Sequence, residues 1–91
     1  MHAVVVRVTI NDEGPAQEML RSEIVPAVSQ APGFVAGYWT RSDDGSNGQS
    51  MVVFESEEGA RGMAQRLRDE GTGNEAVSLD GVEVREVVAN A

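Results

Sequence analysis

The stretch His2–Ile10, which reads HAVVVRVTI, decides the fold of this 91-residue chain. It alternates and is rich in Val, as is typical of a pleated, half-buried strand. The even-numbered positions are all apolar: Val4, Val6, Val8 and Ile10. The odd-numbered positions are mixed: Ala3, Val5, Arg7 and Thr9. The pattern predicts that one face meets a core and that the other face is also partly covered.

The residues that follow this strand predict an amphipathic helix. Asn11–Pro15 is typical of a helix start, with Pro15 suited to the first turn. Apolar residues then recur every three to four positions in one stripe: Ala16, Leu20, Ile24, Ala27 and Ala31. Pro26 lies inside this stripe and removes the hydrogen bond toward Ser22, so we expect a kink or a break there.

Two further strands are predicted, over Phe34–Arg41 and from about Gln49 to Glu55. The polar turn of residues 42–48 joins them. The only Trp and the only Tyr of the chain lie in the first of these strands. The two strands therefore form a hairpin.

A second helix and a last strand complete the chain. Ser56 is a good N-cap for the helix, and Gly71 ends it. The last strand is predicted over Val82–Val88. Residues 72–81 are ambiguous, because Ala76–Leu79 suits either a short hairpin arm or a loop.

The resulting order, β-α-β-β-α-β, predicts an α+β fold of ferredoxin-like architecture, with residues 1–91 as a single domain. Its usual form is a four-stranded antiparallel sheet with both helices on one face. We expect the uncovered face to carry Val5, Trp39 and Phe54, which makes a large apolar patch. Pairing with a second copy would bury this patch, so a homodimer is predicted.

Composition excludes several classes of function. The net charge is −8, with 15 acidic residues against 7 basic ones, and all the basic residues are Arg. This charge argues against binding to nucleic acid or to an anionic membrane. No apolar run reaches the roughly 18–20 residues of a membrane span, and no leader pattern opens the sequence. We therefore expect a cytoplasmic protein.

The chain offers little to a metal ion. It has no Cys, and His2 is its only His. Disulfides and thiolate sites are excluded, and a cage of several His residues is not expected. We predict no metal and no bound cofactor. Without such reinforcement a core this small is marginal, which again favours dimerisation.

Two segments resemble the dimeric α/β-barrel superfamily, in its antibiotic-biosynthesis-monooxygenase-like branch. They are Ala31–Arg41, APGFVAGYWTR, and Met51–Ala60, MVVFESEEGA. The resemblance implies a dimeric α/β barrel in which two ferredoxin-like protomers pack sheet against sheet. It places a ligand between each sheet and its helices, or within the barrel. Relatives carry out cofactor-free oxygenation of aromatic polyketides, haem breakdown, isomerisation and quinol oxidation.

Carried over residue by residue, the resemblance narrows the activity. Haem-degrading relatives have an Asn on the first strand, a Trp on the second helix and a His beyond it. The matching positions here hold Arg7 and Met63, and no His follows His2, which argues against haem degradation. Phe54 takes the place of a bulky pocket aromatic. Val52 replaces a Glu that relatives often carry, which weakens a carried-over acid–base mechanism.

Three residues are the candidate ligand-binding residues: Arg7, Trp39 and Phe54. The Trp39 indole could stack on a flat aromatic substrate, or it could fill the barrel or the dimer contact. Arg7 could hold an anionic or enolate oxygen, or it could pair with Glu83 or Glu86 on the last strand. No catalytic residue is assigned.

The remaining polar and sulfur-containing side chains are given structural roles. We expect Tyr38 to pack on the helices, on the opposite side of its strand from Trp39. Arg41 is expected at the rim or surface, and His2 in solvent. Met51 and Met63 are expected to fill the core.

Two functions remain open. The first is a cofactor-independent monooxygenase or isomerase acting on a small aromatic or polyketide-like compound. The second is a non-catalytic dimeric module that binds a small molecule or serves in a stress response. A pocket of several hundred Å³ would argue against a barrel filled by side chains.

Overall fold

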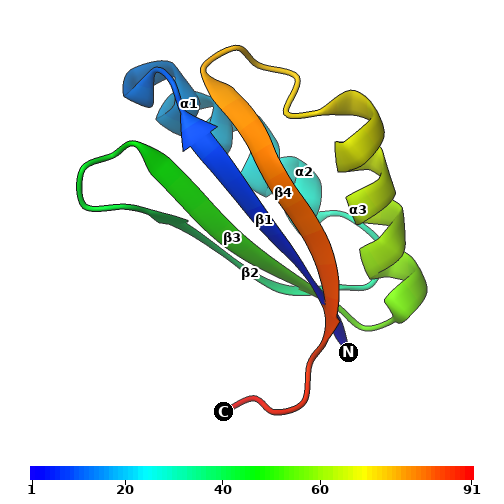
Figure 1. The fold of residues 1–91 in the computed structure, drawn as a ribbon. Coiled ribbons are helices and arrows are strands. Elements are labelled where there is room, and N and C mark those ends of the chain that lie inside the picture. Colours follow the sequence, from blue (N-terminus) through cyan, green and yellow to red (C-terminus); the bar gives the residue numbers. More distant parts are fainter.

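The computed structural model describes residues 1–91 as one four-stranded sheet with its helical segments on one face (Figure 1). The elements are β1 (His2–Ile10), α1 (Glu13–Met19), a π-helical turn η1 (Leu20–Ile24), α2 (Val25–Ser29), β2 (Phe34–Arg41), β3 (Asn47–Phe54), α3 (Glu57–Glu70) and β4 (Val77–Glu86). The strand order is β2-β3-β1-β4, and all neighbours are antiparallel. The predicted α+β ferredoxin-like fold is confirmed.

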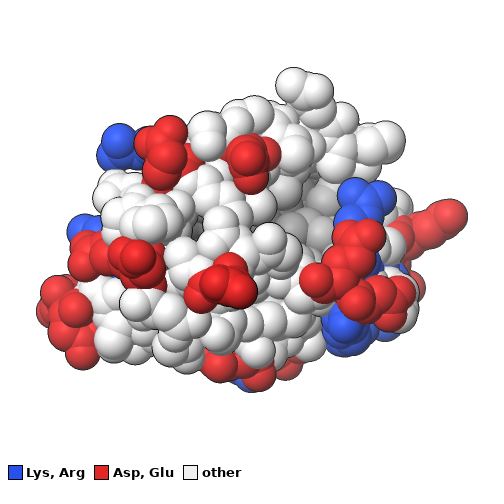
Figure 2. Space-filling model, turned by 90° about the horizontal axis from the view of Figure 1, so that it is seen from above, with Lys and Arg blue, Asp and Glu red and all other residues white.

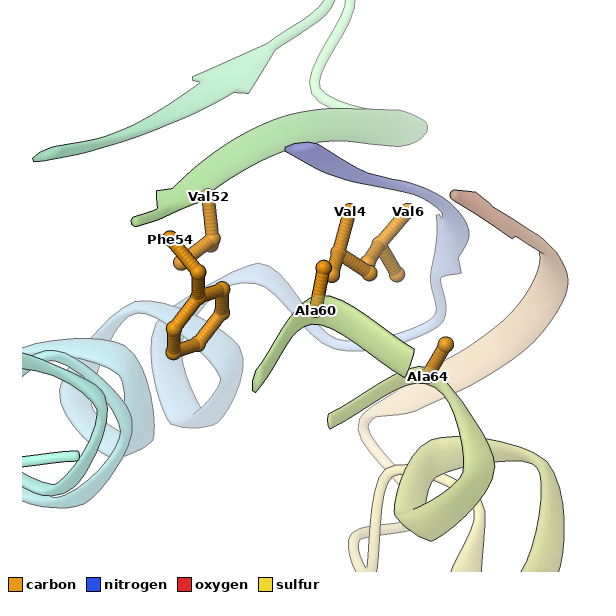
Figure 3. Close-up of a cluster of buried hydrophobic side chains, with 6 residues drawn as sticks. All are labelled: Val4, Val6, Val52, Phe54, Ala60 and Ala64. Atoms are coloured by element: carbon orange, nitrogen blue, oxygen red, sulfur yellow. The ribbon is translucent and has the colours of Figure 1, made fainter. Parts of the chain in front are cut away.

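The core lies where the middle of the sheet meets α3 (Figure 3). It contains six buried residues: Val4, Val6, Val52, Phe54, Ala60 and Ala64. Val4 and Val52 are neighbours in the β1–β3 register and are fully buried. The small side chains of Ala60 and Ala64 let α3 lie close to the sheet. Full burial of each Val contributes about 1.5–3 kcal/mol.

The first helical segment carries the irregularity that Pro26 predicts. The chain changes from α- to π-helical bonding over Leu20–Ile24, directly before Pro26 in the first turn of α2. The Ser22 hydroxyl donates to the Glu18 carbonyl at 2.8 Å, which occupies one backbone acceptor at the transition. Neither α1, η1 nor α2 contains a fully buried residue. This segment is therefore packed less tightly on the sheet than α3.

Helix α3 begins and ends as predicted. The Ser56 hydroxyl accepts a hydrogen bond from the Gly59 amide at 3.1 Å. Gly71 terminates the helix with a φ of 67°, a left-handed conformation that favours glycine. Both signals could be predicted because caps are local in sequence.

The last strand begins earlier than Val82–Val88 and ends earlier too. β4 runs from Val77 to Glu86, so the second half of the ambiguous segment 72–81 is strand. The β1–β4 register shifts between Arg7 and Val8, leaving Asp80 as an extra residue on β4. The Thr9 hydroxyl donates to the Asp80 carboxylate at 2.7 Å and fixes this bulge.

The predicted faces of β2 and β3 are wrong for several residues. Trp39 and Phe54 lie on the helix side, whereas Tyr38 and Met51 are 69% and 44% exposed. Cross-strand partners share a face, and the register pairs Trp39 with Ser50 and Ser50 with Val6. The even-numbered residues of β3 therefore join the helix-facing residues of β1. Tyr38 thus does not pack on the helices, and Met51 does not fill the core.

No helix in the structure combines the length and the apolar character needed to cross a membrane.

Candidate functional site

A pocket of about 370 Å³ lies between the sheet and the first helical segment, beyond the end of the core. Most of its lining is apolar, and it draws on every strand. Its apolar walls include Val6, Val8, Ile10, Ala16, Leu20, Ile24, Trp39, Met63, Leu67 and Leu79. The pocket is half open to solvent. A site of this size and character suits a small apolar ligand.

The sequence of β3 explains why the sheet leaves a hollow at this end. Along its helix-facing side the residues shrink from Phe54 and Val52 to Ser50 and then Gly48. Phe54 and Val52 fill the core, whereas Ser50 and Gly48 leave space opposite Val6 and Val8. The pocket therefore begins where β3 stops supplying large side chains.

Trp39 forms one wall of the pocket and depends on a glycine. A Cβ placed on Gly37 would lie 2.7 Å from Cη2 and 2.8 Å from Cζ3 of the indole. The six-membered ring of Trp39 therefore lies against the bare backbone of Gly37, two residues earlier on β2. Since these atoms are the ones farthest from Nε1, the pyrrole edge of the ring is directed away from Gly37.

An ion pair closes the rim. Glu13, at the start of α1, accepts a hydrogen bond from the Arg41 guanidinium at the end of β2. The Glu13 carboxylate also lies against Gly45 in the β2–β3 turn, where a Cβ would come within 2.8 Å of Oε2. About half of each charged side chain is exposed. The pair connects the loosely packed first helical segment to the hairpin and places Arg41 at the rim, as the sequence predicts.

Charge around this end of the molecule is mostly negative. Figure 2 looks onto the end of the sheet where β1 ends and β4 begins, and it shows acidic side chains around an uncharged, hollowed surface. Among the residues that line the pocket, Glu13 and Arg41 are the only charged ones, and they pair with each other. The interior therefore offers no free charge to a ligand.

The three predicted ligand-binding residues do not come together. Trp39 lines the pocket, while Phe54 is buried in the core and does not line it. Arg7 lies on the opposite face of the sheet, 3.5 Å from Glu83, where the salt bridge considered from the sequence is present. Glu83 also pairs with Arg85 at 3.0 Å. The proposed Arg7–Trp39–Phe54 face is therefore not a single surface.

His2 and Met63 also differ from their predicted surroundings. His2 is partly buried and lies 4.0 Å from Glu57, so it is not a free terminal side chain. Met63 packs against the core and also lines the pocket. His2 does not line the pocket, and neither does any other His or Cys. The pocket thus has no imidazole or thiolate to ligate a haem iron.

Sequence reasoning missed Ser50, Gly48 and the Glu13–Arg41 pair. The available signal was Asn47–Ser50, a small and polar run at the start of an otherwise apolar strand. Such a run is also typical of a strand that simply emerges from a turn. Only the β1–β3 register shows that it lies over the apolar face of β1.

Two carboxyl groups have displaced pKa values, and both lie outside the pocket. Hydrogen bonds from Ser46 and Ser42 lower the pKa of Asp44 from 3.8 to about 2, in the β2–β3 turn. Hydrogen bonds and the positive charge of Arg61 lower the pKa of Glu57 on α3. These groups stabilise a turn and a helix start, and neither contacts the pocket. No cluster of three or more His, Cys, Asp or Glu is arranged to hold a metal ion.

Comparison with known proteins shows the fold. No protein-family model matches the chain, and no curated protein matches it. Among solved structures, a variant of SnoaB, a cofactor-independent oxygenase from Streptomyces nogalater, superposes with a TM-score of 0.68 at 16% identity, covering 98% of this chain and 95% of that one. MhuD, a haem-degrader from Mycobacterium tuberculosis, superposes with a TM-score of 0.65 at 18% identity, covering 100% and 98%.

A third structure, a dimeric ferredoxin-like protein from an uncultured marine organism, has a TM-score of 0.62 at 12% identity and covers 100% and 98%. The fold of the chain is thus that of the antibiotic-biosynthesis-monooxygenase-like, dimeric ferredoxin-like proteins. The predicted resemblance is confirmed at the level of the fold.

Proposed function

We propose that the chain is a homodimeric, monooxygenase-like enzyme that binds a small aromatic or polyketide-like compound in the helix-side pocket and oxygenates it without a bound cofactor. The observation that carries this proposal is the apolar pocket of about 370 Å³ with Trp39 in its wall. Indole rings stack well on flat aromatic compounds. SnoaB, which has the same fold, is a cofactor-independent oxygenase.

The chemistry that suits this pocket is oxygenation of a substrate that activates itself. Anthrone is an example: it loses a proton to give an enolate, and the enolate reduces O₂. Anthrone and one O₂ give anthraquinone and one water, so two C–H bonds are replaced by one C=O bond and O₂ is the oxidant. The only carboxylate that lines the pocket is Glu13, and it is paired with Arg41. This favours substrates whose proton leaves to water rather than to an enzyme base.

The protein's own contribution is to bind the aromatic frame and to exclude water from the reacting carbon. The apolar walls supply the binding energy, at about 25 cal/mol for each Å² of apolar surface that they bury. A low-dielectric wall also strengthens any hydrogen bond to the enolate oxygen. The acceleration would come from positioning and electrostatics.

Oxygen uptake tests this activity directly. An oxygen electrode records consumption with anthrone and related hydroxyanthrones, corrected for the uncatalysed reaction. Ser50→Leu fills the hollow floor of the pocket and should abolish uptake. Ser29→Leu adds the same side chain at an exposed site on α2 and should leave uptake unchanged. Uptake that survives in Ser50→Leu would place the chemistry elsewhere.

A second function is a binding module without turnover. The observation that favours it is the mutual pairing of Glu13 and Arg41, which leaves no free acid or base in the pocket. Because Trp39 is the only Trp, its fluorescence reports binding without a label. Saturable quenching by aromatic compounds, with no oxygen uptake by any of them, would favour this second function over the first.

The homodimer forms through the sheet face that carries no helix. Tyr38 and Met51 are paired in the β2–β3 register and are largely exposed there, next to Val5 and Val53. The Arg7–Glu83–Arg85 ion pairs lie at the β1–β4 side of the same face. A central apolar area with a charged rim is the usual anatomy of an interface. A stable dimer needs about 800 Å² of this face from each copy.

A further inference from the structure

Two half-buried donors in the pocket have no hydrogen-bond partner within the chain. They are the indole Nε1–H of Trp39 and the hydroxyl of Ser50. The neighbouring Thr40 hydroxyl already donates to the Gln49 carbonyl. The Thr72 hydroxyl is 2.7 Å from the Val77 carbonyl. No fully buried side-chain polar atom lacks a partner, so both free donors remain accessible from the pocket.

The free donors are side by side. Trp39 and Ser50 are direct partners in the β2–β3 register, which puts their side chains on one face with Cβ atoms about 5 Å apart. The Gly37 backbone receives the six-membered ring of Trp39 and leaves the Nε1 edge free of that contact. One oxygen atom, or two oxygens on one ring system, can accept from both donors.

A ligand that covers these donors without accepting from them loses affinity. Water satisfies both groups in the empty pocket, and an aromatic hydrocarbon would displace that water and offer nothing in return. Leaving a buried donor unsatisfied lowers affinity by about ten- to a hundredfold. Sites that are built to bond a polar group reject analogues that lack it, for the same reason.

We propose that Trp39 and Ser50 together determine specificity, by selecting aromatic ketones and quinones over aromatic hydrocarbons of the same shape. This inference rests on the proposed function, because it assumes that the pocket binds a flat aromatic compound. The selected acceptor is neutral. A carboxylate would meet an acidic rim and a chain of net charge −8, with its only nearby cation already paired to Glu13.

Paired ligands test the inference. Equilibrium dialysis compares 1,4-naphthoquinone with naphthalene, which has the same flat frame without oxygen atoms. The chain has no Cys and no Lys, so the quinone finds no thiol or lysine amine to alkylate. The wild-type protein should bind the quinone about 10- to 100-fold more tightly. Ser50→Ala and Trp39→Phe should each reduce this ratio by about tenfold.

Control variants separate donor loss from a general change in the pocket. Ser29→Ala removes an exposed hydroxyl and should leave the ratio unchanged, and Ser50→Thr keeps the donor and should retain most of the selectivity. Equal binding of both ligands by the wild type would overturn the inference and leave the proposed function standing. Selectivity that persists in both donor variants would overturn the assignment to this pair. Binding of neither ligand would remove the proposed function as well.

Discussion

At the scale of single residues, two positions without a Cβ shape the pocket. Gly48 leaves the floor open opposite Val8, where a Cβ would lie 3.2 Å from Cγ2 of that residue. Gly37 lets the Trp39 ring lie flat against β2. Neither glycine has a left-handed backbone, so both are used for close approach and not for a turn. The shape of the site therefore depends on what these residues lack.

Gly37→Ala should disturb Trp39 specifically. The new methyl group would overlap the indole, so the ring must move, and the free energy of unfolding should fall by about 1–3 kcal/mol. The Trp39 emission maximum should shift toward that of exposed indole, and ligand affinity should fall. Gly62→Ala is the matched control, because a Cβ there meets nothing within 4 Å and it lies in α3. The control should stabilise the protein by about 0.5–1 kcal/mol. Unchanged fluorescence in Gly37→Ala would contradict the described ring position.

Asp44 should titrate well below an ordinary aspartate. Its pKa is lowered to about 2 by hydrogen bonds from Ser46 and Ser42, which favour the ionised form. Because the folded pKa lies below the ordinary value of 3.8, the carboxylate stabilises the fold above that pH, and this contribution is lost as the pH falls toward 2. Carbon-detected NMR measures the titration. Ser46→Ala should raise the pKa toward 3.8, and an unaltered value would show that the turn is not organised by these bonds.

Buried donors and close-packed rings could not be predicted from the residues alone. Ser56 was predictable as a cap, because the group that it satisfies is three residues away. Ser50 was not, because its role depends on which residue of β1 lies opposite. Trp39 was assigned to the wrong face for the same reason: alternation within β2 cannot say which of its two faces meets the helices.

At the scale of elements, the two helical layers differ in how firmly they are held. α3 buries Ala60 and Ala64 completely against the core. The α1–η1–α2 segment buries no residue fully, and the pocket lies beneath it. The Glu13–Arg41 pair joins the start of α1 to the end of β2. This segment is the part of the fold that must move if a ligand is to enter.

Glu13→Gln should loosen the first helical segment without unfolding the protein. Both charged groups are about half exposed, so losing the pair should lower the free energy of unfolding by no more than about 1 kcal/mol. Amide hydrogen exchange in α1 should become faster, and ligand release should accelerate. Glu57→Gln is the control, because it breaks the 2.7 Å pair with Arg61 on α3, away from the pocket. Equal acceleration of α1 exchange in both variants would argue that the Glu13 pair has no specific effect.

The sequence predicted elements better than their edges. The bounds of β1 and β2 match the prediction, since alternation and turn residues bracket each strand. The start of β4 was missed, because Asp80 and Gly81 resemble a turn within the strand. The structure accommodates Asp80 as a bulge held by Thr9, a partner 71 residues away. Long-range contacts of this kind leave no local pattern.

At the scale of the whole molecule, the two sheet faces have separate roles. The helix side holds the core and the pocket. The open side carries the exposed Tyr38 and Met51 beside a charged network. The chain is small, and burying this face in a second copy would add apolar area that a single copy cannot supply. The proposed dimer and the proposed ligand site therefore do not compete for the same surface.

Tyr38→Glu should convert the dimer into monomers. A carboxylate in the middle of an apolar interface would face its own symmetry mate, which adds repulsion to desolvation. Sedimentation equilibrium at micromolar concentration should give two chains for the wild type and one for the variant. Gln65→Glu adds the same charge on the exposed side of α3 and should remain dimeric. A wild type that sediments as a single chain would contradict the homodimer.

The indole N–H resonance of Trp39 tests the helix-side pocket most directly. The chain has one Trp, so a ¹H–¹⁵N spectrum contains one indole signal. Addition of 1,4-naphthoquinone should shift that signal saturably, with one ligand per chain, while the amide signals of Tyr38 and Met51 stay in place. Movement of the Tyr38 and Met51 signals with a stationary indole would put the ligand on the open face and contradict this account.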